Sequence, residues 1–132
     1  MKFQDNRNCY VCGSDNTVGL RVQFTVDNTA KTITGVFLSL PEHQGYEGIV
    51  HGGIIAALMD EAMVKLAGLL GKPALSAELT VKFLAPAAPG DELTVSARIT
   101  SESKRLIEAE ARVERGPVVI GEATGKLIRT KI

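Results

Sequence analysis

The longest apolar run of the chain, residues 52–70, carries two acidic residues near its middle. In a membrane span Asp60 and Glu61 would each cost roughly 2.5–3.5 kcal/mol, so the run predicts a helix that is buried inside a folded protein. Gly71 and Pro73 follow it, and this order is typical of the end of a helix. The rest of the fold has to cover this one helix.

Six segments alternate apolar and polar residues with the period of two that indicates strands with one buried face. They are residues 18–26, 31–40, 75–83, 93–99, 107–113 and 118–128. The alternation slips near Gly35, which suggests a β-bulge. Four strands in succession after the helix pair antiparallel, so we expect an α+β fold in which one curved antiparallel sheet wraps around a central helix. Such a sheet leaves an edge uncovered, which favours a homodimer.

Length and charge exclude several classes of protein. The 132 residues make a single domain, 1–132, that opens with a short segment, 1–17, containing two cysteines. Lys plus Arg and Asp plus Glu both number 15, so no excess of positive charge is available for nucleic acid or for an anionic membrane. The polar N-terminus lacks the apolar stretch of a signal peptide, so the cytoplasm is the expected location.

Two glycines open the expected helix, although each costs about 1 kcal/mol relative to Ala. Gly52 and Gly53 would let a ligand approach free backbone N–H groups at the positive end of the helix dipole, which suits a developing oxyanion. The alternative, that a neighbouring strand needs the room, is equally favoured. His51 precedes them, and a histidine there more often caps a helix than acts as a base.

Asp60 has no partner on its own helix. The residues three and four positions away are Ala56, Ala57, Met63 and Val64. An unpaired carboxylate in such surroundings indicates a functional site, whereas a partner across a dimer interface, or water, is the structural alternative. Glu61 differs because Lys65 lies four residues further on, and a solvated ion pair between them explains it.

These residues resemble a known motif. The sequence His51-Gly52-Gly53, followed by Leu58, Asp60 and Ala62, resembles that of hotdog-fold acyl-CoA thioesterases, specifically the phenylacetate-pathway thioesterase (PaaI)-like family. Residues 75–86 are similar to the strand after that family's helix, and residues 9–20 resemble the opening of one of its branches. The resemblance implies a hotdog fold, hydrolysis of an acyl-CoA thioester without a cofactor, and a homodimer or a dimer of dimers.

The resemblance also implies roles for individual residues. Gly52 and Gly53 would polarise the thioester carbonyl, and Asp60 would act as base or nucleophile. The substrate-binding positions that it implies are Gly48, His51 and Ser76, the last of which would position water. Taken alone, Ser76 lies on the polar face of its strand and would simply be solvated.

Gly45 departs from the family's pattern, because many members carry Asn six residues before the histidine. Gln44 is adjacent but does not occupy the position of that Asn. The departure concerns the contact that would orient the thioester carbonyl. Two other functions stay open: a non-catalytic acyl-CoA-binding module and a hotdog dehydratase. Asp60 at its spacing favours the thioesterase over both.

Cys9 and Cys12 have the spacing of half a zinc site. Zinc takes four ligands, so the others would have to come from a second subunit or from His43. A tight turn with two reduced thiols is the favoured interpretation, and no metal is expected. Because the pair precedes the first strand, we expect it to be dispensable for the chemistry.

Overall fold

The computed structural model describes residues 3–129, and its elements follow the predicted order of two strands, one helix and four strands. The elements are β1 (Gln23–Asp27), β2 (Thr32–Leu38), a short 3-10 helix η1 (Pro41–His43), α1 (Gly52–Leu69), β3 (Ala74–Phe83), β4 (Glu92–Glu102), β5 (Leu106–Arg115) and β6 (Val118–Arg129). Helix α1 ends one residue before the predicted Leu70. Gly71 follows with φ +79°, the left-handed conformation in which glycine ends helices.

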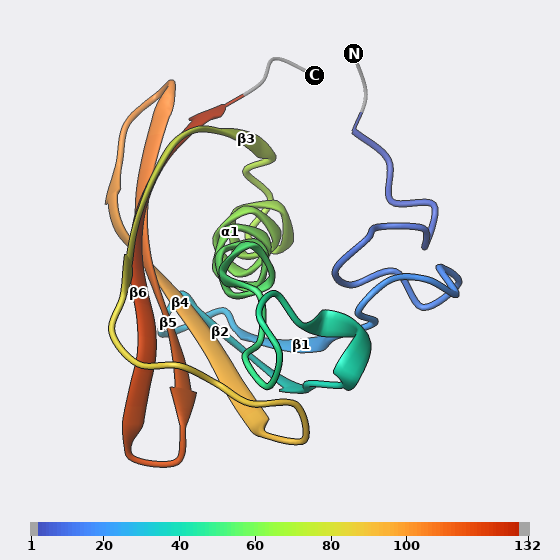
Figure 1. The fold of residues 1–132 in the computed structure, drawn as a ribbon. Coiled ribbons are helices and arrows are strands. Elements are labelled where there is room, and N and C mark those ends of the chain that lie inside the picture. Colours follow the sequence, from blue (N-terminus) through green and yellow to red (C-terminus); the bar gives the residue numbers. More distant parts are fainter. Residues whose placement is uncertain (1–2, 130–132) are drawn as a thin grey trace.

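All six strands form one antiparallel sheet in the order β1-β2-β4-β5-β6-β3. The sheet curls around α1, which lies in its concave side (Figure 1). β3 follows the helix directly, yet it forms the far edge of the sheet beside β6. The expected architecture is therefore confirmed. Between residues 3 and 129 no helix is long and apolar enough to cross a membrane.

The core lies between the concave face of the sheet and the apolar side of α1. The helix residues with no exposed surface are Leu58, Met59, Ala62, Met63 and Leu66. Full burial of a Leu or Met side chain contributes about 1.5–3 kcal/mol. On β6, a Cβ at Gly125 would lie 3.0 Å from the sulfur of Met63, so the absence of a side chain there lets the helix pack closely.

The first predicted strand is shorter than its alternation indicated. Only Gln23–Asp27 is a strand, because the chain before it turns. The Leu20 amide donates to the Tyr10 carbonyl (2.8 Å), and Arg21 has φ +52°, which interrupts an extended run. The prediction of a strand from Val18 is therefore wrong at its start, and residues 18–21 belong to the N-terminal loop.

The bulge expected at Gly35 is absent. The β1–β2 and β2–β4 registers both run without a shift through Gly35. A Cβ there would lie 2.9 Å from a ring carbon of Phe24 on the neighbouring strand. Gly35 therefore makes room for an aromatic ring rather than bending the strand.

The outer edge of β3 has no partner strand within the described chain, although apolar side chains project from this strand. Leu75 is 50% exposed and Phe83 is 58% exposed. Unpaired edges with apolar side chains are typical of surfaces that another chain covers. Residues 3–22 cover part of the side of α1 that the sheet leaves open (Figure 1).

Candidate active site

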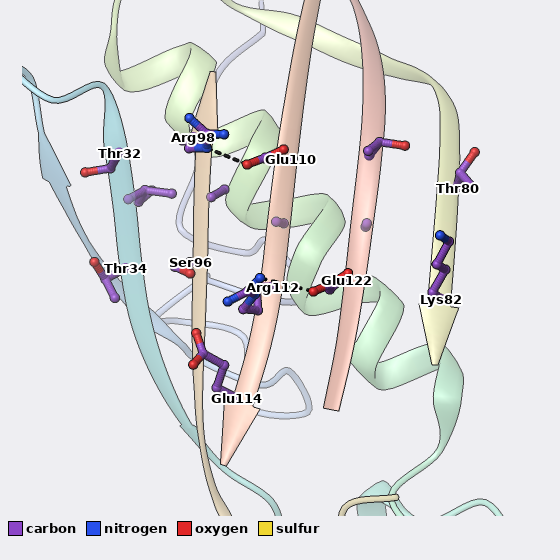
Figure 2. Close-up of a pocket in the computed structure, with 15 residues that line it drawn as sticks. Thr32, Thr34, Thr80, Lys82, Ser96, Arg98, Glu110, Arg112, Glu114 and Glu122 are labelled. Atoms are coloured by element: carbon purple, nitrogen blue, oxygen red, sulfur yellow. Dashed lines mark hydrogen bonds and ion pairs between the residues drawn. The ribbon is translucent and has the colours of Figure 1, made fainter. Parts of the chain in front are cut away.

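One hollow on the surface of the protein does not contain the predicted site residues. It encloses about 540 Å³ on the outer face of the sheet, opposite α1 (Figure 2). Four of its six charged side chains form ion pairs across neighbouring strands: Arg98 with Glu110, and Arg112 with Glu122. Asp60 does not line it. The hollow is open, carries charged side chains and lies on the face of the sheet opposite α1, so Asp60 and the start of the helix belong to the other, concave side.

Asp60 lies near the middle of α1, half-buried, and its carboxylate meets one side chain from the sheet. The hydroxyl of Ser76 on β3 donates to Oδ1 of Asp60. Helix and edge strand thus bring together two residues that the resemblance had linked. The contact lies beside the unpaired edge of β3, where solvent or a ligand can reach it.

A β-bulge explains why Ser76 faces the helix. Along β3, Ser76 pairs with Leu127 and Glu78 pairs with Lys126, so Ala77 is an extra residue without a partner. The extra residue reverses the alternation, and Ser76 joins Phe83 on the helix side of the sheet. The interpretation of residues 75–83 as one continuous apolar face, with Ser76 solvated on the other, is therefore wrong. Strict alternation could not reveal this bulge.

The start of α1 is capped by a histidine side chain. The Gly53 amide donates to Nδ1 of His51, 2.8 Å away. This contact satisfies one of the N–H groups that a helix start leaves without a partner. A Cβ at Gly53 would lie 2.9 Å from that same nitrogen, so the glycine gives the cap its room. Of the two glycines, Gly53 has an engaged amide.

The amide of Gly52 is given no acceptor by the described residues 3–129. Phe83 is its neighbour across the gap to β3, since a Cβ at Gly52 would lie 3.3 Å from the ring. Strand β3 thus does approach the glycine pair, in agreement with the alternative that a neighbouring strand needs the room there. The free N–H remains at the positive end of the helix dipole, where it can donate to an oxygen that carries developing negative charge. Phe83 was not predicted as a site residue. The only signal in the sequence was its position on the apolar face of the strand that follows the helix.

The side chain of Gln44 forms hydrogen bonds within the loop that precedes the helix. Gln44 Nε2 donates to the Pro41 carbonyl (2.8 Å), and Gln44 Oε1 accepts from the Gly48 amide (2.6 Å). Gly48 has φ +78°, a turn conformation that suits glycine. Both ends of the Gln44 amide are therefore engaged within the loop. At Gly45, the position that departs from the pattern implied by the resemblance, a Cβ would lie 3.2 Å from the His51 ring.

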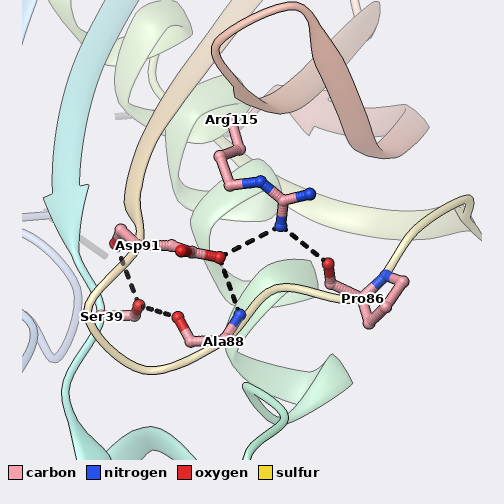
Figure 3. Close-up of polar contacts among 5 residues, drawn as sticks. All are labelled: Ser39, Pro86, Ala88, Asp91 and Arg115. Atoms are coloured by element: carbon pink, nitrogen blue, oxygen red, sulfur yellow. Dashed lines mark hydrogen bonds and ion pairs between the residues drawn. The ribbon is translucent and has the colours of Figure 1, made fainter.

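A second loop holds the approach to the helix in place. The Val50 amide donates to the Ala87 carbonyl (2.8 Å), which joins the residues before α1 to the β3–β4 connection. That connection is fastened by a fully buried serine (Figure 3). The Ser39 hydroxyl donates to the Ala88 carbonyl (2.9 Å) and lies 3.0 Å from the Asp91 carbonyl.

The carboxylate of Asp91, the last residue of the same connection, also stabilises it through hydrogen bonds. It accepts from the Ala88 amide (2.8 Å) and from Arg115 (3.1 Å) (Figure 3). The hydrogen bond from the Ala88 amide, and secondarily the Arg115 guanidinium, hold the pKa of Asp91 below its ordinary 3.8. Arg115 also donates to the Pro86 carbonyl (3.0 Å). The loop that supports the helix start is thus hydrogen-bonded to Arg115 of β5 as well as to Ser39, the residue that follows β2.

Glu61 does not form the predicted ion pair with Lys65. Both side chains contact Cys12 instead: its thiol donates to Glu61 Oε1 (3.1 Å), and Lys65 Nζ lies 3.3 Å from its sulfur. Burial, and then the bond to Glu61, raise the pKa of the Cys12 thiol from 9.0 to about 12. The sequence prediction failed because the partner lies 49 residues away. His43, the other suggested ligand, accepts from the Leu40 amide.

Known proteins resemble this chain both in fold and in the sequence of the segment that contains α1 and β3. The family model of the thioesterase superfamily matches residues 47–121, which include His51, Asp60 and Ser76. The acyl-coenzyme A thioesterase 13 of Homo sapiens is 32% identical over 89 residues, covering 66% of this chain and 59% of the relative. The chain therefore spans less than two thirds of the length of the curated relatives that it matches.

Two solved structures have the same fold. The E. coli PaaI protein from the phenylacetic acid degradation operon superposes with a TM-score of 0.78 at 20% identity, over 85% of this chain and 81% of that one. A Streptococcus mutans protein bound to acetyl CoA superposes with a TM-score of 0.77 at 17% identity, over 83% and 88%. The hotdog fold is thus confirmed. With its family model matching more than half of its length, the chain belongs to the thioesterase superfamily.

Proposed function

We propose that the protein is an acyl-CoA thioesterase that hydrolyses a thioester to a free acid and CoA. The observation that carries the proposal is the contact of Asp60 with Ser76 inside the segment that matches the superfamily. A human relative is named as an acyl-CoA thioesterase, and a protein of the same fold binds acetyl CoA. The substrate class is taken from these proteins.

In the proposed reaction, Asp60 acts as general base toward water or as the nucleophile itself. Ser76 holds the carboxylate and positions the attacking water. The free Gly52 amide donates to the thioester oxygen as negative charge develops on it, and a single such donor is worth about 10²–10³ in rate. His51 serves the site indirectly, because its cap on Gly53 fixes the first turn that carries the Gly52 donor.

The two halves of this machinery lie too far apart to act on one carbonyl in one chain. Asp60 follows Gly52 by eight residues, which corresponds to about 12 Å along a helix. A carbonyl about 3 Å from the amide is out of reach of that carboxylate. We therefore assign each site to two copies of the chain, with the helix start of one beside Asp60 of the other.

The unpaired edge of β3 supports this assembly. A two-fold axis that sets the α1 helices antiparallel would cover the exposed β3 side chains and create two identical sites. Phe83, beside Gly52, would then line the acyl pocket. The charged outer face of the sheet is left free in such a dimer, and a dimer of dimers would use it.

Release of CoA thiol from a panel of acyl-CoA compounds tests the activity. Turnover that requires Asp60 supports an enzyme, whereas tight binding without thiol release would favour an acyl-CoA-binding module. The panel also ranks aryl against medium-chain acyl groups.

Mixing of two inactive variants tests the shared site. Asp60→Asn removes the base, and Gly52→Pro removes the amide donor. In their heterodimer one site carries both defects and the other carries neither. Random exchange of equal amounts should restore about one quarter of wild-type activity, because half of the dimers are mixed and each has one intact site. If mass spectrometry confirms exchange and no activity returns, each site lies within one chain.

A further inference from the structure

Three groups that bind metals converge where the N-terminal segment meets α1. The sulfurs of Cys9 and Cys12 and a carboxylate oxygen of Glu61 all lie within 4.8 Å of one another, and all three residues are partly buried. The Cys12 sulfur is 3.1 Å from Glu61 Oε1. From the sequence, further ligands were expected only from a second subunit or from His43, whereas the fold brings Glu61 of α1 to the two cysteines.

The turn that carries the cysteines is held by hydrogen bonds from two backbone amides. The Cys12 amide donates to the Cys9 sulfur (3.4 Å), and the Gly13 amide donates to the Cys9 carbonyl (2.8 Å). A Cβ at Gly13 would lie only 2.4 Å from the Cys9 nitrogen, so the turn requires glycine there.

We propose that Cys9, Cys12 and Glu61 bind one Zn²⁺ ion that fastens the N-terminal segment to α1. Two thiolates and a carboxylate form a ligand set that zinc accepts, with water in the fourth position. Sulfurs about 2.3 Å from a tetrahedral zinc lie about 3.8 Å apart, which is within the spread of the cluster. Binding replaces the two thiol protons, which are released to solvent.

The charges around the cluster support a divalent cation. With the metal bound, the two thiolates and Glu61 supply three negative charges, and the Lys65 ammonium, 3.3 Å from the Cys12 sulfur, supplies one positive charge. A divalent cation makes the sum zero, so the ion is neutralised where burial would otherwise penalise it. The zinc site is separate from the proposed catalytic residues, because neither Asp60 nor Ser76 is one of its ligands.

Zinc titration of the reduced protein against a chromophoric chelator tests the proposal. Wild type should bind one Zn²⁺ per chain, and Cys9→Ser should abolish stoichiometric binding. Glu61→Gln keeps the size and an acceptor for the Cys12 thiol, so it should fold normally and bind zinc at least tenfold more weakly. Glu108→Gln, on the outer face of β5, is the matched control and should bind as wild type does.

Two further readouts separate a built site from surface thiols. Zinc should raise the melting temperature of wild type and of Glu108→Gln but change that of Glu61→Gln much less, since only folded protein offers the three ligands together. Co²⁺ in place of zinc should give thiolate-to-metal absorption that Cys12→Ser weakens. Less than half a zinc per chain in reduced wild type, or equal zinc affinity of wild type and Glu61→Gln, would overturn the proposal.

Discussion

Replacement of Gly52 by Pro should remove one hydrogen-bond donor and leave the helix intact. Position 52 is the first residue of α1, where Pro is favoured because an N–H there has no partner in the helix. His51 has φ −58° and ψ 132°, an extended conformation that a residue before Pro adopts readily. The described chain gives the Gly52 amide no acceptor, so folding loses no hydrogen bond.

The expected effects on rate and on stability are therefore far apart. Loss of one oxyanion donor lowers kcat by about 10²–10³, or about 2.7–4 kcal/mol of transition-state stabilisation. Pro restricts the unfolded chain, which stabilises the fold by about 0.4–1 kcal/mol, and its Cβ meets the Phe83 ring at 3.3 Å, which offsets part of that gain. Gly52→Ala adds the same Cβ and keeps the N–H, so it isolates the donor.

The assay is thiol release from the best acyl-CoA of the panel, together with urea unfolding of both variants. Gly52→Ala should lose less than about tenfold in kcat, because its amide still donates. Equal rates for the Ala and Pro variants would refute the role of the amide. A Pro variant that unfolds at much lower urea than the Ala variant would refute the argument that position 52 accepts Pro.

Four other variants test the base, the supporting loop and acid stability. Asp60→Asn should lower kcat by about 10²–10⁴ while calorimetry shows acyl-CoA binding preserved, and Ser76→Ala should cost less; near-normal turnover of the Asn variant would sink the assignment. Ser39→Ala should cost about 1–2 kcal/mol in urea unfolding, because a buried hydroxyl is lost while both carbonyls keep a backbone donor; an unchanged midpoint would contradict this. The lowered pKa of Asp91 means that its contribution is complete above about pH 4 and is lost as pH falls through the folded-state pKa. The melting temperatures of wild type and Asp91→Asn should therefore converge on acidification, and a constant difference from pH 7 to pH 3 would count against it.

The strand and helix order was predictable because it rests on local patterns. The apolar run and its glycine end gave α1 to within one residue, and alternation located the later strands. The first strand was overextended at Val18, because apolar residues also alternate in a loop that packs on the core. Sequence periodicity reports which residues are buried, and it does not report what covers them.

The candidate site was predictable in its membership and less so in its contacts. Asp60 stood out because no residue on its own helix could pair with it. The sequence predicted that Glu61 pairs with Lys65, whereas in the fold both side chains contact Cys12. The two glycines looked alike in sequence, and only the fold shows that His51 occupies the amide of Gly53. Contacts between distant segments decided each of these outcomes.

The extra residue in β3 has a consequence for how related sequences are aligned. Ser76 lies seven residues before Phe83, yet both face the helix because Ala77 is unpaired. In a regular strand the residue opposite Asp60 would be six positions before its aromatic counterpart. A gap-free alignment of this chain with a relative that lacks the insertion would therefore assign the hydroxyl to the wrong column. A single insertion or deletion near position 77 can thus change the residue opposite the carboxylate while every neighbouring strand stays unchanged.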